Sequence, residues 1–173
     1  MRFSRVLALL VGVVAAEAAA ECPDHEAGKA ALRAKDFAQA ESRFMRCLAE
    51  ADSPVDRWAA LVGLGLTYDL AGRPVQAVLY YDAFLSASET AELSARWTAR
   101  RARVGAERAR LEGQALRTHG LVRVETTPAG VRVRPPGELA PGLELRSPVE
   151  LLLPGGAHRL HVSHPGYRPR EVG

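Results

Sequence analysis

The sequence predicts a multi-domain, α-then-β fold: antiparallel αα-hairpin repeats followed by a small antiparallel β-sandwich. Three observations support this fold class. A helical pattern recurs after a fixed interval. Near residue 120, the spacing between apolar residues changes from three or four positions to two. Beyond that point, Pro/Gly turns separate short segments in which apolar and polar residues alternate. The predicted boundaries are 1–20 for a signal peptide, 21–118 for the helical part and 119–173 for the β part.

Residues 1–20 have the order of charges and apolar residues found in a secretory signal. Arg2 and Arg5 precede the apolar run 6–14, and the small residues 18–20 form a cleavage site before Glu21. We therefore expect an exported bacterial protein of the periplasm or cell envelope. A retained N-terminal anchor is the alternative.

The charge and length of the mature chain exclude some classes of function. Cleavage leaves 153 residues (173 − 20), and the formal net charge of the full chain is only +3. This charge is too small to indicate a nucleic-acid partner. Glu17 interrupts the apolar run before it reaches the roughly 20 residues of a membrane span, so no integral span is expected. Glu21 stands before Cys22 where a lipoprotein would need a small residue.

Similar residues recur at an interval of 37 positions (65 − 28 = 37) between about residues 24 and 90. The matched pairs are Gly28 with Gly65, Lys35 with Gly72, Ala40 with Ala77, and Phe44 with Tyr81. Small residues allow paired helices to approach closely, and the aromatic residues fill the space beside them. Leu61, Leu64 and Tyr68 add a stripe at helical spacing that faces the core.

These positions resemble the tetratricopeptide repeat, whose usual period is about 34 residues. The resemblance covers about residues 24–117 and rests on Gly28, Ala40 and Phe44 in the first unit and on Leu61, Leu64, Gly65, Tyr68, Gly72, Ala77 and Tyr81 in the second. Three extra residues fit the 52–57 connection. The resemblance implies stacked hairpins with a concave face that takes an extended peptide or a helix. An unrelated hairpin duplicated once is the alternative.

Residues 91–117 predict a long third helix that caps the array. Its apolar side carries Leu93, Trp97, Val104 and Leu111. Its many arginines have glutamates at helical pairing distance, so we interpret them as a solvated, ion-paired face rather than a nucleic-acid site.

Cys22 and Cys47 are the two cysteines, and export would place them where disulfides persist. Cys22 precedes the first predicted helix and Cys47 lies near the end of the second, so an antiparallel hairpin would bring them together. We expect a bridge to be feasible, with two separate thiols as the alternative.

From Leu121 the sequence alternates with period two between Pro and Gly turns, which predicts strands near 121–126, 130–134, 149–153 and 158–164. This part resembles the PEGA domain, a small β-sandwich of bacterial envelope proteins. Its motif positions here are Pro128, Val131, Pro148, Gly156, His158, Gly166 and Tyr167. Two departures are a long 135–146 loop and a chain that stops just inside the last strand, which leaves open a fragment of a larger, membrane-anchored envelope component.

Catalytic and metal-binding signatures are not found in the sequence, and no cofactor is expected. His158 and His164 share a strand face but are too far apart to chelate one ion, and His161 points to the other face. The sequence thus predicts a non-enzymatic scaffold that binds a protein or peptide partner through the concave face of its repeats. The alternative is binding of a cell-wall polymer, peptidoglycan or surface polysaccharide, through the β part, for which Tyr167 is the obvious exposed aromatic residue.

Overall fold

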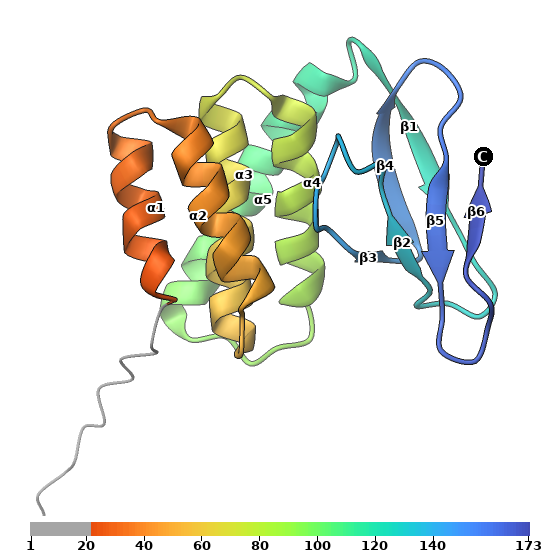
Figure 1. The fold of residues 1–173 in the computed structure, drawn as a ribbon, viewed down its shortest axis with the longest axis horizontal. Coiled ribbons are helices and arrows are strands. Elements are labelled where there is room, and N and C mark those ends of the chain that lie inside the picture. Colours follow the sequence, from red (N-terminus) through yellow and green to blue (C-terminus); the bar gives the residue numbers. More distant parts are fainter. Residues whose placement is uncertain (1–21) are drawn as a thin grey trace, which may run out of the picture.

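The structure is a computed structural model that describes residues 22–173. The predicted signal peptide lies outside the described residues. Five helices precede six strands in this described part (Figure 1). The helices are α1 (Pro23–Arg33), α2 (Phe37–Ala49), α3 (Pro54–Leu70), α4 (Pro74–Ala87) and α5 (Ala95–Ala115). The strands are β1 (His119–Val124), β2 (Arg132–Arg134), β3 (Leu145–Arg146), β4 (Val149–Pro154), β5 (Leu160–Ser163) and β6 (Arg170–Val172).

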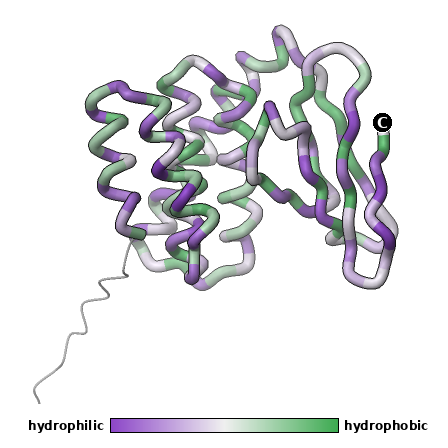
Figure 2. Tube along the Cα trace, in the orientation of Figure 1, coloured by the Kyte–Doolittle hydropathy of each residue, from purple (hydrophilic) through white to green (hydrophobic). Residues whose placement is uncertain are grey.

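The helix starts follow local sequence signals. Proline occupies the first turn of α1, α3 and α4, where its missing N–H removes no helical hydrogen bond. The side chains of Asp36 and Ser53 cap α2 and α3 by accepting hydrogen bonds from the N–H groups of Gln39 and Asp56, each at 3.0 Å. Figure 2 shows that hydrophobic residues recur along these helices between hydrophilic ones.

The two hairpins α1–α2 and α3–α4 turn in the same way. The Asp36 N–H donates to the Ala31 carbonyl at 2.9 Å, and the Arg73 N–H, 37 residues later, donates to the Tyr68 carbonyl at 2.8 Å. Each turn contains one residue with positive φ, Lys35 at 59° and its counterpart Gly72 at 72°. The interval of 37 residues in the sequence therefore corresponds to a repeated backbone geometry.

Close helix contacts in both hairpins depend on the matched glycines. A Cβ atom placed on Gly28 would lie 2.8 Å from the Phe44 ring, and one placed on Gly65 would lie 2.3 Å from the Tyr81 ring. Such contacts are too short for real Cβ atoms, so only glycine fits at these two positions.

The capping helix, α5, is shorter at both ends than the 91–117 segment predicted for it, and it packs against α4. Its arginines form ion pairs, including Arg108 with Glu112 at 2.5 Å and Arg110 with Glu107 at 2.7 Å. At the other end of the array, Cys22 and Cys47 form a disulfide with their Cα atoms 5.6 Å apart, which joins the start of α1 to the end of α2.

The strands form two antiparallel sheets. One contains β1 and β4, and the other has the order β3-β2-β5-β6. Two predicted details were wrong. The 135–146 segment ends in the short strand β3 instead of being loop throughout, and β5 begins at Leu160, so His158 lies in the preceding turn.

The helical and β parts share one apolar core. Leu151, Leu152 and Leu153 of β4 are at most 4% exposed, although successive strand residues point to opposite faces. Strand β4 is therefore covered on both faces, and it contacts α4 (Figure 1). The segment before β3 also packs on α4, where the Tyr80 hydroxyl donates to the Pro141 carbonyl at 2.7 Å.

Within residues 22–173, each helix is too short or too polar to cross a membrane.

Candidate functional site

A groove lies between α1, α3 and α5, the first helices of the two hairpins and the capping helix. Its floor is formed by Phe44, Val62, Gly63, Leu66 and Trp97, and its rim by Lys29, Arg96 and Arg100. The groove encloses about 190 Å³, and no residue of the β part lines it. The β part contacts α4 instead, so this face of the helical array stays uncovered.

The floor is apolar and partly open to solvent. A Cβ atom on Gly63 would lie 2.6 Å from the Phe44 ring, so glycine at this position lets the ring reach the floor. Val62 is 6% exposed, whereas Leu66 is 37% exposed and Leu70, one turn further along α3, is 54% exposed. Exposed leucines next to a buried apolar floor are suited to receive an apolar side chain of a partner.

Two aromatic neighbours hold Trp97 at the α5 side of the groove. The ring centroid of Trp97 lies 5.5 Å from Trp58 in an edge-to-face arrangement and 5.9 Å from Phe84. Aromatic pairs at such distances add to the stability of an apolar cluster. The indole is thus fixed before any partner arrives, and this reduces the entropy lost on binding.

The groove rim is basic. Lys29, Arg96 and Arg100 line it, and no Asp or Glu does. Lys29 pairs with Glu26 outside the groove, and this hydrogen bond lowers the pKa of the Glu26 carboxyl. Arg100 forms no hydrogen bond or ion pair with any residue among 22–173. Its guanidinium is therefore available to a carboxylate of a partner.

The predicted repeat residues lie mainly in the buried core of the helical part. Ala40, Phe44 and Ala77 are fully buried, and Tyr68 and Tyr81 are at most 3% exposed. Burial raises the pKa of both tyrosines well above the ordinary value, so they stay neutral. Both tyrosines belong to the core of the helical part, and of the predicted repeat positions only Phe44 lines the groove.

The predicted β motif positions fall in three places. Pro128, Val131, Gly166 and Tyr167 line a hollow at the end of the β part, described below. Pro148 lines the cavity between the helices and β4. Gly156 and His158 lie in the turn before β5, where a ring nitrogen of His158 is 2.7 Å from the Pro154 carbonyl oxygen.

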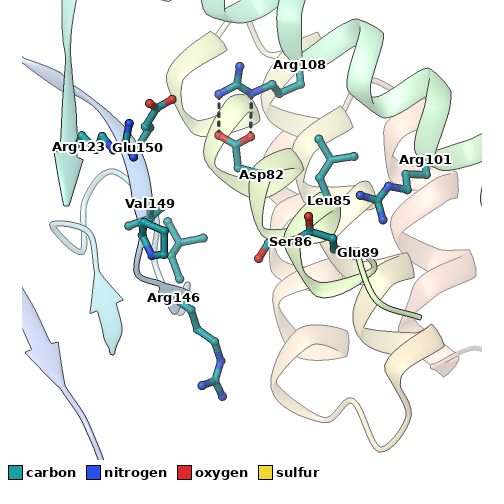
Figure 3. Close-up of a pocket in the computed structure, with 12 residues that line it drawn as sticks. Asp82, Leu85, Ser86, Glu89, Arg101, Arg108, Arg123, Arg146, Val149 and Glu150 are labelled. Atoms are coloured by element: carbon teal, nitrogen blue, oxygen red, sulfur yellow. Dashed lines mark hydrogen bonds and ion pairs between the residues drawn. The ribbon is translucent and has the colours of Figure 1, made fainter. Parts of the chain in front are cut away.

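The cavity between α4, α5 and β4 is the hollow shown in Figure 3, with a volume of about 450 Å³. One ion pair joins two of its lining residues, and one of its arginines bonds to a backbone carbonyl. Arg108 donates to both carboxylate oxygens of Asp82, at 2.7 and 3.3 Å, and Arg101 donates to the Ser88 carbonyl at 2.6 Å. Burial raises the pKa of Asp82 even though the hydrogen bonds from Arg108 oppose the shift. We interpret this cavity as a polar junction between the two parts.

The sequence analysis identified Trp97 but missed Val62 and Leu66, which line the groove, and Leu70, the exposed leucine one turn further along α3. These residues recur at every fourth position of α3 on the side opposite Leu61, Leu64 and Tyr68. The available signal was that this helix is apolar on two sides, whereas packing against the protein core needs only one apolar side.

Among the described residues, no three His, Cys, Asp or Glu side chains gather in a way that could hold a metal ion. In comparisons with known proteins, no family model matches the chain, no curated protein is significantly similar to it, and no solved structure matches it significantly.

Proposed function

We propose that this chain is an exported, non-enzymatic scaffold of the bacterial cell envelope that binds a segment of a partner protein in the groove between α1, α3 and α5. The observation that carries the proposal is the combination of an apolar floor, where Leu66 is 37% exposed, with a rim of three basic residues and no acidic one. Such a surface suits a segment with apolar side chains on one face and carboxylates beside them.

The sequence features support the same proposal. The order of residues 1–20 favours export, and the repeat positions resemble tetratricopeptide repeats, whose stacked hairpins bind protein segments. The repeated turn geometry of the two hairpins is consistent with that resemblance. The β part, with its resemblance to a PEGA domain, would then be a second module attached to the convex side of the array.

Site-specific photo-crosslinking in the native envelope tests this proposal. A photoreactive residue at Leu66 should give a discrete adduct with one envelope protein, and the adduct should weaken about tenfold when Arg100 is replaced by Glu. The same residue at Leu116 is the matched control, since that leucine is 47% exposed but lies outside the groove. Equal labelling at Leu66 and Leu116, or none at Leu66, would contradict the proposal.

A further inference from the structure

A second hollow lies at the end of the β part, far from the groove in the fold, and encloses about 540 Å³. Its floor is apolar and includes Pro128, Val131 and Val162. Val133, Val162 and Arg170 are paired across β2, β5 and β6, and this row runs from a fully buried valine to an exposed arginine. The hollow is therefore built into the edge of the four-stranded sheet.

Tyr167 forms an exposed aromatic wall of this hollow. Its side chain is 64% exposed, the highest value among the large hydrophobic residues of the described chain. The position of the ring is nevertheless defined. The turn from His164 to Tyr167 is closed by a hydrogen bond of 3.1 Å, Gly166 has φ of 84° as a type II turn requires, and the His164 ring packs edge-on at 5.4 Å.

Two arginines beside Tyr167 have guanidinium groups that bond to no other residue among 22–173. Arg168 and Arg170 line the hollow, and neither guanidinium group forms a hydrogen bond or ion pair with another residue among 22–173. The other five arginines of the β part all have one. Arg123, Arg132, Arg134 and Arg159 pair with glutamates, and Arg146 donates to a carbonyl. No Asp or Glu lines the hollow, so the two guanidinium groups face it uncompensated.

We propose that this hollow binds an acidic polysaccharide, a chain of sugar rings that carry carboxylates. The apolar C–H face of a sugar ring can lie against an exposed, fixed tyrosine ring, and guanidinium groups bind carboxylates through paired hydrogen bonds. The hydroxyls of Thr127 and Ser163 at the hollow can exchange hydrogen bonds with sugar hydroxyls. The volume is within the usual range for ligand sites.

The same observations disfavour the other acidic polymers. Binding of single-stranded nucleic acid draws its affinity from cations that follow many phosphates and from several stacked bases, whereas this hollow offers two free cations and one tyrosine. An acidic peptide would satisfy the arginines but has no ring to place on Tyr167. This proposal is independent of the function proposed for the groove, because the two sites share no residue.

Affinity electrophoresis of the full-length protein tests the proposal. The gels contain polygalacturonate, alginate or hyaluronate as acidic sugars, and polyglutamate, dextran or oligo-dT as comparison polymers. We expect retardation by at least one acidic sugar polymer at moderate salt and little by the comparison polymers. Tyr167→Ala, and separately the double variant Arg168→Gln/Arg170→Gln, should each weaken the retardation about tenfold or more.

Arg159→Gln is the matched control, since it removes an exposed arginine of the same region that lies outside the hollow. It should leave retardation unchanged. Absence of retardation in all three acidic sugars overturns the proposal. So does retardation that survives Tyr167→Ala, which would indicate charge attraction alone. Equal or stronger binding of polyglutamate or oligo-dT would assign the hollow to a peptide or a nucleic acid instead.

Discussion

Single residues decide how closely the helices of each hairpin can approach. Gly28 and Gly65 face aromatic rings across the hairpin, and Gly63 gives Phe44 access to the groove. Other glycines in the helices have no such neighbour; a Cβ on Gly113 of α5 would meet nothing within 4 Å. The same residue type therefore has opposite consequences for stability at different positions.

Gly65→Ala should destabilise the protein. The new methyl group would overlap Tyr81, which is 3% exposed and has little room to move, so we expect a loss of about 1–3 kcal/mol in the free energy of unfolding. Gly113→Ala is the matched control and should be neutral or stabilising by up to about 1 kcal/mol, because alanine favours the helix. Urea denaturation of both variants checks this, and equal midpoints would contradict the assigned contact.

Asp82 should make stability depend on pH in a defined direction. Burial raises its pKa in the folded state, so folding disfavours its ionised form. The resulting loss in the free energy of unfolding is absent at pH values below about 3.9, the ordinary pKa of Asp. It develops as pH rises through that value and is complete above the raised pKa of Asp82. Asp82→Asn should therefore gain stability relative to the wild type between pH 3 and pH 7. Paired urea titrations at both pH values measure this difference, and a relative loss would refute the expected sign.

At the scale of elements, the first hairpin is the one held covalently. Its two helices are joined by the Cys22–Cys47 disulfide, which spans 25 residues of sequence. The second hairpin has no cysteine and is enclosed instead by α2, α5 and the β part. The bridge thus stabilises the end of the array that has a neighbour on one side only.

Replacing both cysteines by serine should lower the free energy of unfolding by about 3 kcal/mol, because the unfolded chain regains the freedom of a 25-residue loop. Thermal melts of the oxidised wild type and the Cys22→Ser/Cys47→Ser variant measure the loss. Reduced wild type is the control and should melt close to the variant. A variant as stable as the oxidised protein would show that the bridge contributes nothing.

Elements with internal periodicity could be predicted from the sequence, and elements that depend on distant partners could not. Gly28 and Gly65, each 16 residues before an aromatic residue (44 − 28 = 81 − 65 = 16), indicated the hairpins because helix packing repeats locally. Strand β3 contains only Leu145 and Arg146, too few to show alternation, and it exists through its pairing with β2. The concave binding face predicted from the sequence stays a prediction, and the basic rim of the groove combines residues of α1 and α5 that only the tertiary fold brings together.

At the scale of the whole molecule, the two parts meet at α4. Tyr80 donates to the Pro141 carbonyl there, and Ala140 and Leu143 of the same segment are 2% exposed. The β part therefore covers apolar surface of the helical array, while the link between α5 and β1 is only a short turn.

The proposed division into domains predicts that a 21–118 fragment folds alone. We expect a cooperative helical melt by circular dichroism, because the hairpins, the capping helix and the disulfide all lie within it. Its melting temperature should be lower than that of the full chain, since Tyr80 and its apolar neighbours lose their cover. A random-coil spectrum would mean that the β part is needed to complete the helical core.

The contact of the 135–144 segment with α4 limits where helical hairpins can be added to the array or removed from it. The position equivalent to Tyr80 in the first hairpin is Arg43, which bonds to Asp24 at 2.6 Å and offers no hydroxyl for the Pro141 carbonyl. A copy of the first hairpin inserted directly before α5 would thus separate the β part from its docking residue. The same copy inserted before α3 would leave both in place. We therefore expect descendants of this chain to gain or lose hairpins on the N-terminal side of α3 and to keep α3–α4, α5 and the β part consecutive in the sequence.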